Sequence, residues 1–231
     1  MMSKNSLMLA PFAMLCVVLA LLAPRPAAAM PIVAGVSFTA TNLGFTDSFS
    51  RMIGWQFTVG PVSIEVTELG FQDFGLDGLL SSHQVGIWRL SDSVLIDSAV
   101  VPSGTAGTLH GHFRYAALAS PSTLVSGTTY LISGFDTGID PHVWDVDIGG
   151  ANANKQVTGF SVDAAITIGA PGTAHGPFMA SFGFPGSTTV PDARAALMGP
   201  NLRFSLVPEP GSFALTAFGI LLLWGSSKPR G

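Results

Sequence analysis

Cysteine is nearly absent from this chain of 231 residues. The single thiol, Cys16, lies inside an apolar run near the N-terminus, so the rest of the sequence can form no disulfide and must be stabilised by packing. Leu15 precedes it in the middle of that run, whereas a lipid-attachment signal requires a small residue before a cysteine at the end of the run. The sequence therefore excludes both a disulfide framework and lipid anchoring at Cys16.

Charged residues are also scarce, at 10% of the chain. Between positions 30 and 207, six Lys or Arg face thirteen Asp or Glu, a net charge of −7, and such a surface repels nucleic acid. The 27 glycines and 16 prolines, with few lysines and glutamates, favour turns and strands over long helices. Once both hydrophobic ends are set aside, the length suits one domain, which we expect to be mostly β.

Catalytic motifs are missing as well. The sequence has no G-x-S-x-G elbow, no H-E-x-x-H, no phosphate-binding loop and no paired cysteines for a metal. Glu65 and Glu68 are the only internal glutamates, and a spacing of three on a strand predicts opposite faces, which would prevent them from acting as a glycosidase pair. Aspartates remain possible, but no pattern selects two. We therefore predict a protein that is not an enzyme, with no catalytic residue, cofactor or metal.

The first 29 residues have the organisation of a secretory signal peptide. Lys4 precedes a nearly uncharged run over 7–23, and a Pro-Arg-Pro breaker at 24–26 leads to three alanines. Ala27 and Ala29 are small enough for the pockets of signal peptidase, which predicts cleavage after Ala29. The alternative is a retained membrane anchor.

The last 25 residues, 207–231, combine a proline-rich hinge, an apolar segment and a basic end. Segment 212–224 carries no charge, and as a transmembrane helix it would span only about 20 Å of a hydrocarbon core about 30 Å thick, which suits a transient anchor. Lys228 and Arg230 are expected to stay on the cytoplasmic side. Pro208 and Pro210 disfavour helix, so Glu209 would be held in extended backbone just outside the membrane.

These residues resemble the PEP-CTERM sorting tail, in which Val-Pro-Glu-Pro precedes a short apolar helix and a basic cluster. The resemblance implies that Pro208, Glu209 and Pro210 form the motif recognised by exosortase, a membrane cysteine transpeptidase, with Lys228 and Arg230 as the stop. It also implies an exopolysaccharide-producing Gram-negative bacterium and delivery to the cell surface or extracellular matrix. The alternative is a plain tail anchor.

Between these ends, residues 30–206 show the alternation of half-buried strands. Val62, Ile64 and Val66 alternate with polar neighbours, and Thr123–Val125 and Thr128–Ile132 flank a Ser-Gly hairpin turn. Further strands are predicted over Ile53–Val59, His83–Leu90, Val94–Val101, Leu109–Tyr115, Phe160–Ile168, Phe178–Phe184 and Leu202–Leu206. Eight or more short strands without intervening helices predict an antiparallel β-sandwich of jelly-roll type.

Within this domain, residues 54–134 resemble an uncharacterised β-sandwich family of exported bacterial proteins. The likeness lies in the order of a Gly-aromatic strand at Gly54-Trp55, the Leu69-Gly70 step, Gly78-Leu79 and the His-x-Val-x-Ile-Trp pattern at 83–88. It continues through Phe-Arg-Tyr at 113–115 and Ser-Gly-Thr-Thr-Tyr at 126–130. The family has no agreed activity, but its association with carbohydrate-related modules implies matrix or glycan contact.

Three histidines are candidates for a functional site. His110 and His112, with Arg114 beside them on one strand face, suggest a metal or anion site, although a solvated polar face is the stronger interpretation. His83 shares a face with Val85 and Ile87, which favours a buried, hydrogen-bonded structural histidine over a catalytic one.

Two further groups have a functional and a structural interpretation. Aspartates could bind Ca²⁺, although turn formation is the stronger interpretation. They are Asp73 and Asp77, and Asp136, Asp140, Asp145 and Asp147 in a loop with His142 and Trp144. Aromatic residues could be platforms for sugar rings or core residues, and they are Trp55, Trp88, Trp144, Tyr115 and Tyr130.

Together these features predict an exported surface or matrix protein that contacts glycan without catalysis. The expected partners are signal peptidase and exosortase during processing, the membrane through the tail, and extracellular polysaccharide, with no nucleic acid. Two alternatives remain: a secreted carbohydrate-active hydrolase, and a purely structural component of the matrix.

Overall fold

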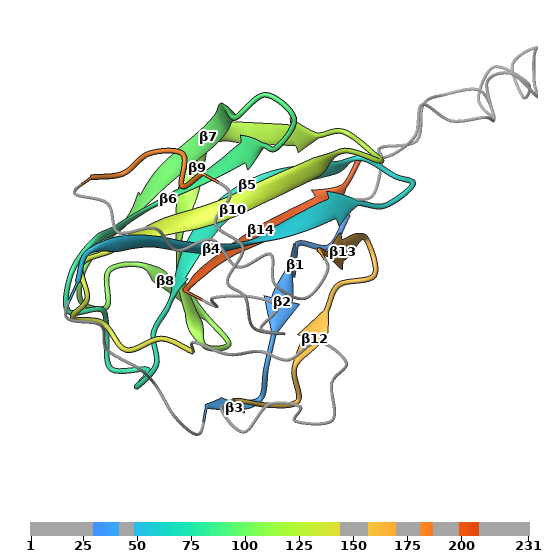
Figure 1. Ribbon diagram of the computed structural model, residues 1–231. Helices are drawn as coiled ribbons and strands as arrows, with labels where there is room; N and C mark the ends of the chain where they lie inside the picture. The colour runs from blue at the N-terminus through green and yellow to red at the C-terminus, as the bar shows by residue number, and fades with distance from the viewer. Residues whose placement is uncertain (1–29, 42–48, 144–156, 170–180, 187–198, 208–231) are drawn as a thin grey trace, which may run out of the picture.

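The computed structural model describes residues 30–41, 49–143, 157–169, 181–186 and 199–207 (Figure 1). The predicted signal peptide with Ala27 and Ala29, the motif at 208–210, the apolar segment 212–224 and the basic end lie outside these residues. Every regular element in the described part is a strand. No helix there is long and apolar enough to cross a membrane.

Fourteen strands make up this part of the chain. In order they are β1 Val33–Ala34, β2 Val36–Ser37, β3 Ala40–Thr41, β4 Arg51–Val59, β5 Ile64–Gln72, β6 His83–Arg89, β7 Val94–Val101, β8 Thr108–His110, β9 Phe113–Leu124, β10 Thr129–Asp136, β11 Val157–Thr158, β12 Ser161–Val162, β13 Ile166–Ile168 and β14 Pro200–Leu206. Their pairing is antiparallel throughout, which confirms the all-β antiparallel class.

Two five-stranded sheets curl around one shared core (Figure 1). The first sheet has the order β1-β14-β5-β9-β8, and the second has the order β13-β4-β10-β6-β7. Two short pairs, β2 with β12 and β3 with β11, join residues before position 42 to residues 157–162. The chain therefore brings its early and late described segments together beside the first sheet.

The core follows the two-residue alternation of the strands. On β4, Ile53, Trp55 and Phe57 are fully buried and face the other sheet. Burial of each such side chain contributes roughly 1.5 to 3 kcal/mol to folding. The sequence predictions for β4, β6, β7 and β14 are confirmed. The strands β9 and β10 also form, with Gly127 at φ 70° in the turn between them, but the predicted hairpin was wrong, because this turn carries the chain from the first sheet to the second and the two strands do not pair with each other.

A β-bulge on β5 changes which residues share a face. The pairing of β5 shifts between Val66 and Glu68, so Thr67 is the extra residue and the alternation restarts after it. Glu65 pairs with Ser205 and Glu68 with Arg203, two residues apart on β14, so both glutamates lie on the outer face. The prediction that they face opposite ways was wrong, because it assumed an uninterrupted strand.

Three other strand predictions need correction. The expected strand over 160–168 is divided into β12 and β13, because a turn forms in which the Asp163 carbonyl accepts from the Ile166 amide. Residues 181–186 contain Phe182 and Phe184 but form no strand, and Phe178 lies outside the described residues. The predicted strand through Leu109–Tyr115 is interrupted by a turn at Gly111, whose φ is 58°.

Candidate functional site

A buried polar cluster joins the start of β6 to the end of β10 and the segment after it. His83 is fully buried, as its alternation with Val85 and Ile87 predicts. Its Nε2 lies 2.9 Å from Oδ2 of Asp140, and its Nδ1 lies 3.0 Å from the Phe135 carbonyl oxygen. Both ring nitrogens therefore face acceptors within the protein.

Ser81 completes this cluster but does not form a nucleophilic triad with it. Its Oγ donates to Asp140 at 3.0 Å and lies 3.4 Å from Nε2 of His83, while the other ring nitrogen is occupied by a backbone carbonyl. In a triad the carboxylate and the nucleophile bind opposite nitrogens of the ring, so that the histidine can take the nucleophile's proton. Here both bind the same side, so the arrangement holds the chain together instead.

Asp140 anchors the loop between Leu79 and His83. Its carboxylate also accepts from the backbone amides of Leu80 at 2.6 Å and Ser81 at 2.9 Å. Burial raises the pKa of Asp140, but the hydrogen bonds from His83 and the two amides outweigh burial and lower it below the ordinary value. The carboxylate is thus ionised at neutral pH and committed to internal donors.

Asp136 and His142 form a second buried contact beside the first. Nδ1 of His142 lies 3.5 Å from Oδ2 of Asp136, and both side chains are fully buried. Burial raises the pKa of Asp136 and lowers that of His142 to about 4, so the ring is neutral at physiological pH. This contact, like the one at His83, is closed to solvent.

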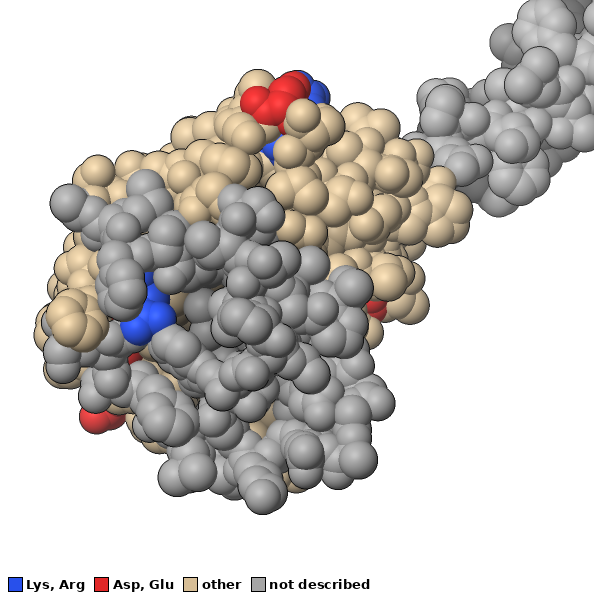
Figure 2. All heavy atoms as spheres, in the orientation of Figure 1, with Lys and Arg blue, Asp and Glu red and all other residues tan. Residues whose placement is uncertain are grey.

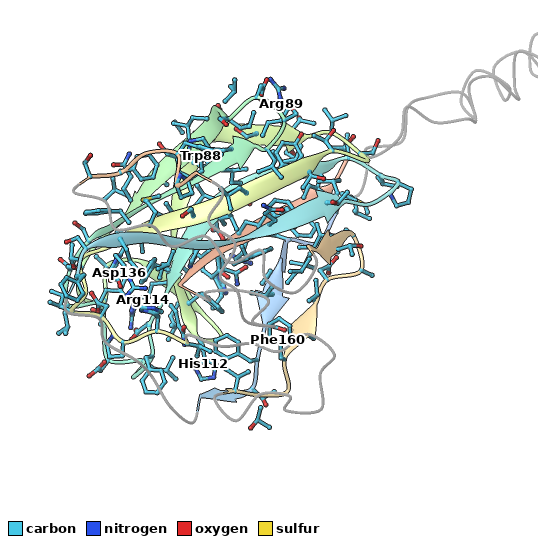
Figure 3. The ribbon with its side chains drawn as sticks, viewed as in Figure 1. Trp88, Arg89, His112, Arg114, Asp136 and Phe160 are labelled. Carbon is cyan, nitrogen blue, oxygen red and sulfur yellow. The ribbon has the colours of Figure 1, made fainter. Side chains whose placement is uncertain are left out.

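Asp73 and Arg114 form a third buried pair at the same end of the molecule, where Figure 3 labels Arg114 close to Asp136. Nε of Arg114 donates to Oδ2 of Asp73 at 2.6 Å, and its Nη1 donates to the carbonyls of Thr105 and Gly107. Arg114 therefore points into the protein, and the predicted grouping of Arg114 with His110 and His112 was wrong.

The predicted calcium sites find no support in the described residues. Three of these aspartates accept hydrogen bonds from donors inside the protein, namely Asp73, Asp136 and Asp140. The side chain of Asp77 is exposed to solvent. Within the described ranges, no three His, Cys, Asp or Glu side chains are grouped to hold a metal ion. Asp145, Asp147 and Trp144 lie outside those ranges.

The aromatic residues considered as sugar platforms are buried where the structure describes them. Trp55, Trp88, Tyr115 and Tyr130 are all buried. Trp88, on the outer face of the second sheet, is covered by Phe182, with ring centroids 5.2 Å apart (labelled in Figure 3). None of these four offers an open ring face.

An open hollow of about 230 Å³ lies between β1–β2 and the β8–β9 turn. Its apolar lining residues are Ile32, Ala34, Val36 and Phe38. Its polar lining residues are His110 and His112, which flank Gly111, and Arg203 from β14, which is the cross-strand partner of Ala34. The turn at Gly111 brings both histidines to this hollow, which we call the β8–β9 hollow.

Contacts with aromatic rings hold the polar lining residues of the β8–β9 hollow in position. The His112 ring stacks on Phe38 with centroids 5.0 Å apart, and Figure 3 shows His112 below Arg114. The buried ring of Tyr115 lies 5.9 Å from His110 and 5.7 Å from the Arg203 guanidinium. The sequence analysis identified the two histidines but missed Arg203. The one indication in the sequence was that a single cationic residue interrupts an otherwise mostly apolar strand.

The charge around the β8–β9 hollow contrasts with the rest of the domain. Among the described residues no Asp or Glu lines it, whereas the segment 30–207 as a whole has a net charge of −7. Figure 2 colours the charged atoms of the described residues on the face in view, with Lys and Arg blue and Asp and Glu red. Arg203 pairs with Glu68 through Nη1, and its other guanidinium nitrogens have no hydrogen-bond partner among the described residues.

A larger hollow of about 330 Å³ lies where the described chain begins and β14 ends. It is almost entirely apolar, with Val33, Val62 and Phe204 among its lining residues. Its one charged residue, Asp163, already accepts a hydrogen bond from the Ala165 amide. This hollow offers little to a polar ligand, so the β8–β9 hollow is the better candidate site.

The sequence matches no protein-family model, and no curated protein is significantly similar to it.

Proposed function

We propose that this chain is an exported surface or matrix protein whose domain contacts extracellular polysaccharide without catalysis. The observation that carries the proposal is the contrast between the two polar regions. Side chains of the kind used in catalysis, His83, Asp136 and Asp140, are buried and bonded to one another or to the backbone. The open β8–β9 hollow has cationic and aromatic residues, and none of its lining residues in the described ranges is a carboxylate that could act as an acid or base.

The proposed architecture is a β-sandwich of jelly-roll type. Taking β1, β4, β5, β6, β7, β9, β10 and β14 as the main strands, each consecutive strand crosses to the other sheet, except that β6 and β7 form a hairpin within the second sheet. Such crossings are characteristic of two interleaved Greek keys. Jelly-roll sandwiches present ligand surfaces in lectin domains, which supports a binding function by analogy of fold alone.

Export and sorting rest on the two ends of the sequence. The signal peptide directs export with cleavage after Ala29, and exosortase recognises Pro208, Glu209 and Pro210 while the apolar segment 212–224 holds the tail in the membrane. Replacing Glu209 by Ala is expected to leave uncut precursor in the membrane fraction. Normal processing of Glu209→Ala would reject exosortase recognition.

Polysaccharide contact is tested with the full chain purified in detergent. We expect it to be retained on immobilised extracellular polysaccharide from the producing cells and to release no reducing ends from that polymer over time. Retention without release supports a binding module. Release of reducing ends would support the hydrolase instead, and absence of retention would support a purely structural matrix component.

A further inference from the structure

The β8–β9 hollow combines polar and apolar lining. Arg203, His110 and His112 supply nitrogen donors, and Ile32 and Ala34 supply accessible apolar surface beside them. A sugar ring has the matching character, with apolar C–H groups on its face and oxygens at its edge. The volume of the hollow, about 230 Å³, lies below the usual range of pockets for drug-sized ligands and suits a single sugar ring.

The donors in the hollow select for negative charge. Arginine binds carboxylates through paired N–H groups, and only one nitrogen of Arg203 is used by Glu68. Within the described part of the chain no acidic side chain lines the hollow, and the carboxylate that lies nearest to its polar lining, Glu68, is paired with Arg203. The net charge of −7 over residues 30–207 repels acidic polymers elsewhere, so an acidic ligand would be directed to this one region.

His112 carries an incomplete hydrogen-bond set beside this hollow. Its Nδ1 is buried and has no hydrogen-bond partner among the described residues, and the same holds for the hydroxyl of Tyr115 beneath. A buried polar atom without a partner is unfavourable. The stack on Phe38 fixes the plane of the His112 ring, and rotation of the ring by half a turn within that plane of packing would turn this nitrogen toward a ligand.

From these observations we propose that the β8–β9 hollow binds a uronic acid residue of an acidic polysaccharide. The carboxylate lies against Arg203 and the two histidines, and the C–H face of the sugar ring lies against Ile32 and Ala34. This inference rests on the proposed function, because it names the class of polysaccharide that the domain contacts.

The test compares oligogalacturonate with its methyl ester, which keeps the sugar rings but removes the charge. Binding of each to the full chain in detergent is measured by calorimetry. We expect the acid to bind at least about tenfold more tightly than the ester, and the difference to shrink with added salt. Equal binding of both would overturn the acidic preference while leaving glycan contact intact. Binding of neither would overturn the proposed function as well.

Two variants locate the site, and a third serves as the control. Arg203→Gln and His110→Ala are expected to weaken binding of the acid by about tenfold or more, since each removes a donor from the hollow. Arg89→Gln removes an exposed arginine of the second sheet, paired with Asp92, and is expected to leave binding unchanged. His110 is exposed, so its removal tests the site even if Arg203→Gln unfolds. Wild-type affinity in His110→Ala and in folded Arg203→Gln would overturn the assignment.

Discussion

The imidazole of His83 lies flat against the phenyl ring of Phe71, with ring centroids 3.7 Å apart and planes within 1°. Phe71 belongs to the first sheet and His83 to the second, so the stack joins the two sheets in the core. Hydrogen bonds from its two ring nitrogens to Asp140 and to the Phe135 carbonyl hold the His83 ring in this position. A histidine thus takes a place that a purely apolar core would give to a hydrophobic side chain.

Asp140→Ala is expected to destabilise the fold by about 3 to 5 kcal/mol, because it leaves His83 and two backbone amides buried without their acceptor. Urea unfolding at neutral pH measures the loss. Asp92→Ala is the matched control, since it breaks an exposed ion pair with Arg89 and should change stability little. Equal effects of the two substitutions would contradict the structural role of Asp140.

Acidification is expected to weaken the fold through His142. Its pKa falls from 6.5 to about 4 on burial, so between these values the unfolded chain takes up a proton that the folded protein does not. Stability is therefore full above pH 6.5 and falls towards pH 4 by roughly 3 kcal/mol, at about 1.4 kcal/mol per pH unit.

Two neighbouring carboxylates modify this pH dependence. Asp136 has a raised pKa, so the folded protein takes up its proton first and offsets part of the loss as the pH falls. Asp140 has a lowered pKa, so its contribution is present above the ordinary value of 3.8 and is lost below it. Urea unfolding between pH 6.5 and 4 should show a flatter slope in His142→Gln than in wild type; an unchanged slope would assign the effect elsewhere.

Gly54→Ala is expected to cost about 3 kcal/mol or more, as overpacking does in a close-packed core. A Cβ at this position would overlap the Ile132 carbonyl oxygen and lie 2.8 Å from Cα of Ser133, both backbone atoms of the neighbouring strand β10. Gly127→Ala is the control, because its φ of 70° is strained but the space around it is open, and it should cost only about 1 to 2 kcal/mol. Chemical unfolding of both variants checks the order, and a smaller loss for Gly54→Ala would contradict the close β4–β10 contact.

Ala29→Phe is expected to retain the leader, because a large side chain does not fit the small pocket of signal peptidase. Intact-mass measurement of the exported protein reports the N-terminus directly. Ala28→Phe is the control, since the position between Ala27 and Ala29 is not one of the two small residues that the A-x-A signal requires. Cleavage of Ala29→Phe at the same bond would disprove the predicted site.

The sequence by itself determined the strands of the domain and the burial of His83. Alternation with a period of two and glycine turns are local properties, so β4, β6, β7 and the turn at Gly127 could be predicted from neighbouring residues, whereas the partners of β9 and β10 in two different sheets could not. The same local reasoning failed at β5 and Gly111, because a bulge and a tight turn each shift the alternation without an unambiguous signal in composition.

Only the tertiary structure decided which polar residues meet. Asp140 reaches His83 across 57 positions, and Asn201 bonds the backbone of Val36 across 165, because sheet pairing brings distant segments together. That pairing also places Arg203 beside His110, at the hollow where we propose a uronic acid binds. Contacts of this kind depend on the register and curl of two whole sheets, whereas a strand depends on its own few residues.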